Sequence, residues 1–297
     1  MTGPSRVKAF LTGLLLFCFL LGLGPQPLRA AGKAEALQGT ITISGAWALY
    51  PMVVKWAEEF QKIYPKVKID IAAGGAGKGM VDCLAQIADL GMVSRDIYPE
   101  EKAKGAWWVS VVKDAVVPTM NEKHPFAQAL LKRGLKREEA MAIWITGTIR
   151  KWNELAGGEK THEIHVYTRA DACGAAETWA KYLGKNQEDL LGVGVYGDPG
   201  LAEAVRGDEL GLGFNNINYV YDNQTKEPVK GIRILPLDLD GNGVIEEEEN
   251  FYARRQDVVQ AIAKGKYPSP PARNLHLVCY GRPRKEIVRV FLRWVLT

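Results

Sequence analysis

The sequence has few of the residue types on which enzymes and metal sites most often depend. Its 297 residues include four cysteines and four histidines, and the histidines are scattered along the chain. No Cys-x-x-Cys, His-Glu-x-x-His or Gly-x-Ser-x-Gly motif occurs. These absences argue against zinc sites, dithiol redox centres and the common serine hydrolases. We therefore expect a protein that is not an enzyme.

An excess of charge of one sign is also missing. The formal net charge is +4, and removal of residues 1–30 takes away three basic residues and no acidic residue, which leaves +1. A near-neutral chain lacks the basic surface that binds nucleic-acid phosphates, so we exclude nucleic acid as a partner. The composition, 47% hydrophobic and 24% charged, is that of a globular protein and excludes collagen, coiled coil and disorder.

Long apolar runs are confined to the N-terminus. Arg6 and Lys8 precede an apolar run at 9–23, and small residues follow around Ala30. This order is typical of a secretory signal peptide, so we predict that residues 1–30 are removed by cleavage near Ala30 and that the mature protein is exported. The alternative is an uncleaved anchor. No later segment approaches the length of a membrane span, so a function at the membrane requires a partner.

Three cysteines follow the predicted cleavage site: Cys83, Cys173 and Cys279. An odd number in an exported protein leaves at least one thiol free, and the sequence leaves open whether the other two pair. Cys173 stands at the start of a predicted helix, where a thiol could act as a nucleophile. No partner base is evident, which makes a Cys173 hydrolase the weakest of the functional hypotheses.

Strands and helices alternate along the mature chain. Alternating apolar residues predict strands at 39–44 and 67–71, and helical spacing predicts a helix at 51–64 between them. The order repeats at 165–183, which predicts an α/β fold with parallel strands. We expect two lobes, each with its own sheet. The predicted division gives residues 39–117 and 225–297 to lobe 1 and residues 118–224 to lobe 2.

Three turns in the predicted fold join a strand to a helix and are rich in small residues. The candidate ligand-binding residues in them are Trp47 and Ala48 in the first, Ala76 and Gly77 in the second, and Arg169, Asp171, Cys173, Gly174 and Ala175 in the third. A helix N-terminus presents free N–H groups and the positive end of the helix dipole, which together bind anions. Arg169 would add a guanidinium suited to an oxyanion. The turns match neither a P-loop nor a clean Gly-x-Gly-x-x-Gly motif, so nucleotide binding is not expected.

The sharpest motif lies at residues 238–249. It fits the twelve-residue calcium loop of an EF-hand, with Gly243 at the sharp turn and Glu246 placed to act through water. The predicted metal ligands are Asp238, Asp240, Asn242, Val244 (through its carbonyl) and Glu249. The flanking segments do not read as the two helices of an EF-hand, which favours a structural Ca²⁺ clamp over a sensor. The alternative is an acidic, solvated turn.

Seven segments of the mature chain carry a resemblance when they are taken together: 45–51, 55–60, 73–79, 89–95, 148–152, 169–174 and 211–214. In these segments the sequence resembles the phosphate-binding proteins of bacterial ABC uptake systems. The resemblance covers nearly the whole mature chain and implies a two-lobed periplasmic binding fold of type II. It further implies a monomer without catalytic cofactor that closes on a small oxyanion, with Ser94 among its ligands, and delivers it to a membrane permease.

The sequence departs from that family at the residues whose hydroxyl groups hold the anion. Trp47 and Ala76 stand where the family has Ser or Thr, and Cys173-Gly174-Ala175 stands where it has Ser-Gly-Thr. The leading hypothesis is an exported solute-binding protein for an oxyanion, most simply phosphate. The alternative is a calcium-stabilised sensor or adhesion module that kept the fold and lost transport.

Overall fold

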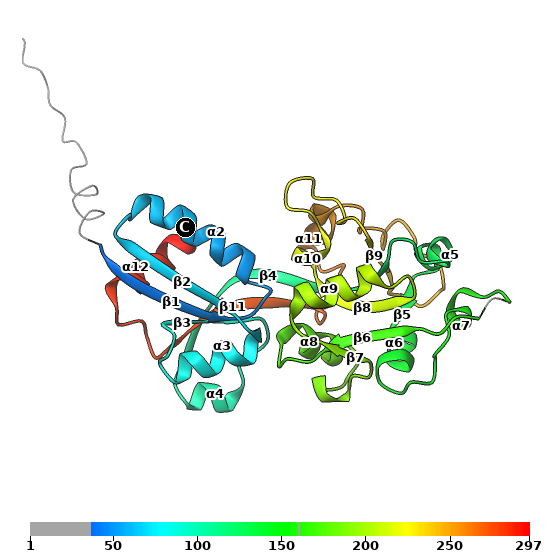
Figure 1. Ribbon diagram of the computed structural model, residues 1–297, viewed down its shortest axis with the longest axis horizontal. Helices are drawn as coiled ribbons and strands as arrows, with labels where there is room; N and C mark the ends of the chain where they lie inside the picture. The colour runs from blue at the N-terminus through cyan, green and yellow to red at the C-terminus, as the bar shows by residue number, and fades with distance from the viewer. Residues whose placement is uncertain (1–36, 160) are drawn as a thin grey trace, which may run out of the picture.

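The chain folds into two lobes joined by two long strands (Figure 1). A computed structural model describes residues 37–159 and 161–297. The predicted signal peptide and its cleavage site lie outside the described residues. The two-lobed α/β architecture predicted from the sequence is confirmed. The expectation that each lobe has its own sheet is wrong, because the long strands that join the lobes connect their strands into one sheet.

Lobe 1 is an open sheet in the order β2–β1–β3–β11–β4, to which β4 contributes its first part, and helices cover this sheet. β1 pairs in parallel with both of its neighbours, and β11 runs antiparallel to β3. Its elements are β1 (Gly39–Gly45), α2 (Tyr50–Ile63), β2 (Val67–Ala73), α3 (Gly75–Leu84), β3 (Leu90–Val93), α4 (Pro99–Ala103), part of β11 (Ala272–Tyr280) and α12 (Glu286–Val295). Figure 1 shows α2 and α12 on one side of the sheet and α3 and α4 on the other. Phe60 and Phe291 join α2 to α12, with ring centroids 5.2 Å apart.

Lobe 2 continues the sheet through β4, β8, β6 and β7, with β9 also paired to β4. Its strands are part of β4 (Ala106–Asn121), β5 (Leu135–Lys136), β6 (His165–Arg169), β7 (Val193–Val195), β8 (Gly211–Asn216), β9 (Ile232–Ile234) and β10 (Leu237–Asp238). Its helices are α5 (Ala127–Arg133), α6 (Arg137–Trp144), α7 (Asn153–Ala156), α8 (Gly174–Tyr182), the 3₁₀ turn η1 (Gln187–Asp189), α9 (Gly197–Gly207), α10 (Ile217–Val220) and α11 (Arg255–Ala263). The buried rings of Trp144, Trp179 and Phe214 pack together at its centre.

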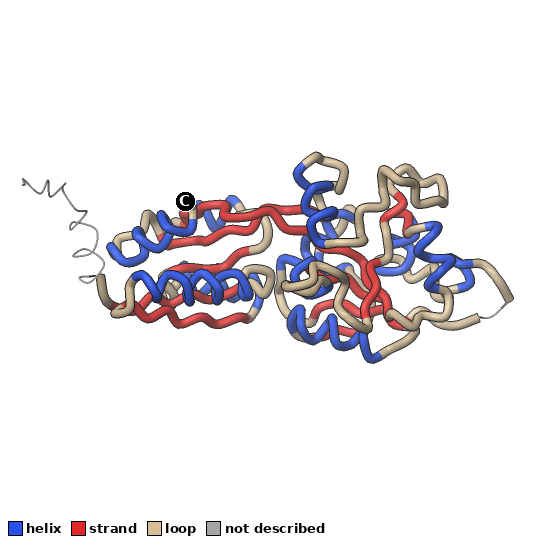
Figure 2. The backbone as a smooth tube through the Cα atoms, turned by 90° about the horizontal axis from the view of Figure 1, so that it is seen from above, coloured by secondary structure: helices blue, strands red, loops and turns tan. Residues whose placement is uncertain are grey.

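Strands β4 and β11 run antiparallel from one lobe to the other (Figures 1 and 2). The lobes have separate hydrophobic cores. On β4 the core of lobe 1 ends at Val112 and that of lobe 2 begins at Ala115. The residues between the two cores pair in register, Asp114 with Arg273 and Lys113 with Asn274. These four residues therefore mark the natural hinge.

The second lobe is larger than the predicted division allowed. Residues 225–271, expected in lobe 1, contribute Ile234, Val258 and Tyr267 to the core of lobe 2. The chain stays in lobe 2 because β9 pairs with β4 and α11 packs against β4. The boundary expected at 225 therefore lies near Arg273, and the acidic loop 238–249 belongs to lobe 2 rather than lobe 1.

Ala76 and Gly77, which were predicted to lie in the second strand-to-helix turn, lie in the first turn of helix α3, which starts at Gly75. Within the described residues, no helix combines the length and apolar character needed to cross a bilayer.

Candidate functional site

The three predicted anion-binding turns meet where the two lobes touch. β1, β2 and β6 end at Gly45, Ala73 and Arg169, and each is followed by a turn into a helix. The turns before α2 and α3 come from lobe 1, and the turn before α8 comes from lobe 2. Ligands in open α/β sheets bind beyond the carboxyl ends of the strands, which is where these turns lie.

Two glycines show how closely the lobes approach. A Cβ on Gly75 would lie 2.6 Å from Ala172 O and 3.0 Å from an oxygen of Asp171. A Cβ on Gly174 would overlap the carbonyl and hydroxyl oxygens of Ser94. The first turns of α3 and α8 and the end of β3 are thus in contact across the lobe boundary.

The Gly77 amide serves this contact. Its N–H, expected to face an anion, donates to Ala172 O across the boundary at 3.2 Å. Gly77 therefore holds the lobes together, and that N–H is not available to a ligand in this arrangement. The first-turn N–H groups of Ala76 and of Ala175 have no acceptor inside their own helices.

Trp47 and Ala48 of the first turn dock on lobe 2. The Trp47 carbonyl accepts a hydrogen bond from the Tyr219 hydroxyl at 2.9 Å, and the Ala48 carbonyl accepts from Asn218 Nδ2 at 3.2 Å. The indole of Trp47 lies edge-on to the ring of Tyr196, with centroids 6.2 Å apart. Trp47 is therefore an aromatic wall between the lobes, at the place where the family resemblance implies a hydroxyl.

Arg169 is fully buried and paired with two carboxylates. Its Nε and one terminal nitrogen donate to the two oxygens of Asp171 at 2.8 and 2.6 Å, and its other terminal nitrogen donates to Asp198 Oδ2 at 2.8 Å. Burial alone lowers the pKa of Arg169, but attraction to Asp198 and Asp171 outweighs this and holds the pKa above its ordinary value. A guanidinium has five N–H groups, so two are left after these bonds.

A second buried guanidinium links this pair to the hinge. Arg273 donates to Asp114 Oδ2 at 3.2 Å and to Asn216 Oδ1, and Asn216 in turn donates to Asp198 Oδ1 at 2.5 Å. Arg273 also donates to the carbonyl of Gly174. Burial raises the pKa of Asp114 to about 6, although Arg273 lowers it in part. A continuous polar network therefore runs from the cleft to the crossing strands.

Sequence reasoning missed Asp198, Asn216, Arg273 and Asp114. Asp198 had a usable signal, because it stands in a Gly-Asp-Pro-Gly segment that opens a helix. The other three lie in strands without any motif, far apart in the chain. Two guanidinium groups face three carboxylates in this network, counting Asp171, so its formal charge is not positive.

Cys173 caps helix α8 and is not an activated nucleophile. Its sulfur accepts a hydrogen bond from Ala176 N at 3.4 Å. Burial raises the pKa of this thiol to about 12, more than the nearby Arg169 lowers it. The thiol is therefore protonated at neutral pH, which removes the basis for the Cys173 hydrolase. The three cysteines of the described residues are unpaired, which settles the open question of a disulfide among them.

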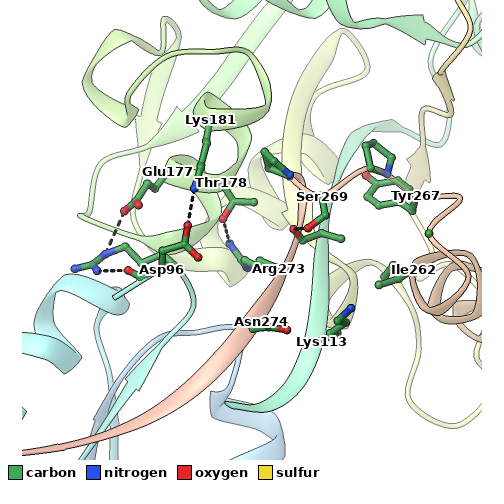
Figure 3. A pocket seen from close by; sticks show the side chains of 15 residues that line it. Asp96, Lys113, Glu177, Thr178, Lys181, Ile262, Tyr267, Ser269, Arg273 and Asn274 are labelled. Atoms are coloured by element: carbon green, nitrogen blue, oxygen red, sulfur yellow. Dashed lines mark hydrogen bonds and ion pairs between the residues drawn. The ribbon is translucent and has the colours of Figure 1, made fainter. Parts of the chain in front are cut away.

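Two pockets open along the lobe boundary beside α8. One of about 400 Å³ lies at the hinge and is lined by Lys113, Thr178 and Arg273 (Figure 3). The other, of about 460 Å³, lies by Gly77 and Cys173. Arg95, Glu177 and Lys181 line both pockets.

Ion pairs bridge the lobes at these pockets. Arg95 of lobe 1 lies 3.1 Å from Glu177 of lobe 2. Lys181 of lobe 2 lies 2.5 Å from Asp96 of lobe 1 (Figure 3). Arg95 also pairs with Glu101 of its own lobe at 2.6 Å. Hydrogen bonds and ion pairs thus both hold the two lobes together.

The acidic loop lies away from this boundary, at the outer end of lobe 2. Ile245 N donates to Lys132 O at 2.8 Å, which places the loop beside α5. Asp238, Asp240 and Glu249 each offer a carboxylate oxygen, and these oxygens lie within 4.8 Å of one another. Three of the predicted metal ligands are therefore together.

Known proteins of similar sequence and structure include phosphate-binding proteins of ABC transporters. The phosphate-binding protein PstS of Bacillus subtilis is 27% identical over 241 residues, which cover 80% of this chain and 70% of that protein. A putative phosphate ABC transporter substrate-binding protein with bound phosphate from Clostridium perfringens has a TM-score of 0.70 at 22% identity and covers 87% of this chain and 93% of that chain. An ABC-type phosphate transport receptor from Vibrio cholerae has a TM-score of 0.60 at 18% identity, and the match covers 86% of this chain and 93% of that receptor. These relatives confirm the resemblance and the periplasmic-binding-protein fold.

The family model of the PBP superfamily domain matches residues 30–297, nearly the whole chain after the predicted leader. The chain therefore belongs to the PBP superfamily.

Proposed function

We propose that this protein captures phosphate between its two lobes and delivers it to the membrane permease of an ABC transporter. The observation that carries the proposal is the meeting of three strand-to-helix turns from both lobes at one boundary. The names of the relatives supply the ligand and the transporter. The function is binding and release, with no chemical step.

The anion would be held mainly by main-chain N–H groups. Ala48, Ala76 and Ala175 stand at or just before the first turns of α2, α3 and α8, where amides are free and the helix dipole is positive. Ser94 adds a buried hydroxyl. Arg169 contributes its two remaining N–H groups rather than an unpaired charge, because Asp171 and Asp198 already balance it.

This chemistry predicts weaker binding than in relatives that carry the hydroxyl groups. Loss of the four hydroxyl donors costs about 1.5 kcal/mol each. A total of about 6 kcal/mol corresponds to roughly ten-thousandfold in Kd. Main-chain donors that gain strength in the dry, closed cleft would offset part of this loss.

Capture would require the lobes to part and close again about the hinge. β4 and β11 alone carry the chain between the two cores, so rotation there separates the turns without disturbing either core. Such a protein works as a monomer in the periplasm after removal of residues 1–30. The acidic loop 238–249 would have a structural role apart from anion binding, because a Ca²⁺ ion there would stabilise lobe 2 without contacting the anion.

A sensor or adhesion role is the second candidate. The observation that favours it is that the carboxylates of Asp171, Asp198 and Asp114 balance the charges of Arg169 and Arg273, which leaves no net positive charge for an anion. In that case the lobes stay closed on their own contacts and no small anion binds.

Titration calorimetry on residues 31–297 distinguishes phosphate capture for transport from the sensor or adhesion role. Phosphate, sulfate, molybdate and a small carboxylate are titrated separately at one ionic strength. The proposal predicts one phosphate per chain and weaker binding of the other anions. Absence of heat with all four anions would favour the sensor or adhesion role, and preference for another anion would replace phosphate.

A further inference from the structure

The acidic loop of lobe 2 holds a buried carboxylate oxygen that the protein leaves without a partner. Glu249 is 7% exposed, and its Oε2 has no hydrogen-bond partner among the described residues. Its Oε1 accepts hydrogen bonds from Leu239 N at 2.6 Å and from Asp240 N at 3.3 Å. Because burying an unpaired carboxylate oxygen is costly, this geometry calls for a cation.

The neighbouring carboxylates are spaced as ligands of one ion. Oxygens of Asp238, Asp240 and Glu249 lie within 4.8 Å of one another. Two oxygens bound to one Ca²⁺ at about 2.3–2.6 Å can be at most about 5.2 Å apart. Without an ion, three like charges at these distances repel one another.

The protein's own cation nearby does not balance this charge. Lys136 Nζ lies 4.0 Å from Asp238 Oδ2 and donates a hydrogen bond to the Gly241 carbonyl at the rim of the loop. One ammonium group at that distance faces three carboxylates, and the Asp238 side chain is fully buried.

We propose that residues 238–249 bind one Ca²⁺ ion. The ligands are the carboxylates of Asp238 and Asp240, the Asn242 side-chain oxygen, the Val244 carbonyl and both oxygens of Glu249, with Glu246 acting through water. A bidentate carboxylate and more than six oxygens suit Ca²⁺, whereas Mg²⁺ demands a smaller octahedral shell.

The ion ties the two ends of the loop to the core of lobe 2. Asp238 ends β10, which pairs with β5. Glu249 is followed by Phe251 and Tyr252, which are buried in that core, and the Tyr252 hydroxyl accepts a hydrogen bond from Leu237 N at 3.2 Å. Binding therefore stabilises lobe 2, independently of whether the cleft binds phosphate.

The test uses the chain 31–297 freed of metal with a chelator. CaCl₂ is titrated by calorimetry, and the melting temperature is measured in chelator, in Ca²⁺ and in Mg²⁺. We expect one Ca²⁺ per chain, with a Kd in the range of about 10⁻⁶ to 10⁻³ M, and a melting temperature that rises with Ca²⁺ and less with Mg²⁺. No heat and an unchanged melting temperature would overturn the proposal, as would tighter binding of Mg²⁺.

Variants assign the ligands. Glu249→Gln and Asp240→Asn should each weaken Ca²⁺ binding at least tenfold. Asp240 is exposed, so Asp240→Asn tests the site even if the buried Glu249→Gln variant does not fold. Glu247→Gln, an exposed neighbour that is not a predicted ligand, should bind Ca²⁺ as the parent does. Equal losses in all three variants would mean a diffuse acidic surface and would contradict the site.

Discussion

Gly174 of lobe 2 lies against Ser94 of lobe 1 so closely that a Cβ on the glycine would overlap the serine's carbonyl and hydroxyl oxygens. The contact lies between the two lobes rather than inside either core. A side chain here therefore acts as a wedge that opposes closure and leaves each lobe intact.

Gly174→Ala should weaken phosphate binding by about a hundredfold or more, with little change in the free energy of unfolding. The physical reason is that the closed arrangement becomes strained, at about 3 kcal/mol, whereas the open one does not. Calorimetry and urea unfolding measure the two effects. The matched control is Gly207→Ala, where a Cβ meets nothing within 4 Å. A variant that binds like the parent would show that the cleft does not close as described.

Restoring hydroxyl donors should strengthen phosphate binding. Ala76→Ser and Ala175→Thr place a hydroxyl on the first turns of α3 and α8, where a hydrogen bond to the anion contributes about 1.5 kcal/mol. Each should lower the Kd for phosphate about tenfold. Ala180→Ser, a buried position later on α8, is the control and should leave the Kd unchanged. No gain from either first-turn variant would place the anion elsewhere.

The ion pairs between the lobes should differ in their effect on binding. Glu177 is half-buried and forms an ion pair with Arg95, so Glu177→Gln removes a charged contact worth about 1–2 kcal/mol and should raise the Kd five- to thirtyfold. Lys181 and Asp96 are exposed, so Lys181→Met should change the Kd less than about threefold. Stopped-flow tryptophan fluorescence should locate the Glu177 effect in faster phosphate release. The reverse ranking would show that closure depends on the exposed pair.

The Asp114 carboxyl should contribute more to the free energy of unfolding in acid than at neutral pH. Burial raises its pKa in the folded state to about 6, above the unfolded value, so its protonated form favours folding. This contribution is present below about pH 4 and is lost as the pH rises through about 6, a change of about 3 kcal/mol.

Asp114→Asn should remove that dependence. The free energy of unfolding is measured with urea at about pH 4 and about pH 7. Between these pH values the parent should lose about 3 kcal/mol more of this free energy than the variant does. Asp70→Asn, on the exposed side of β2, serves as the control. An identical pH dependence in parent and Asp114→Asn would mean that Arg273 keeps Asp114 ionised throughout.

Local patterns predicted the strands and the turns but not the network behind them. Alternation and glycine located the junctions of strand and helix near Trp47, Ala76 and Gly174, although Ala76 and Gly174 lie inside the first turns of α3 and α8. The pairing of Arg169 with Asp198 depends on α9 packing beside β6, a long-range contact without a periodic signal. The lobe boundary was misplaced for the same reason, since the short strand β9 shows its lobe only through its pairing with β4.

A crystal structure of residues 31–297 grown with phosphate tests the central claim most directly. We predict a phosphate ion between the lobes, within hydrogen-bonding distance of the N–H groups of Ala48, Ala76 and Ala175, with Arg169 still paired to Asp171. A cleft closed without phosphate, or a phosphate ion bound away from these three amides, would contradict the account.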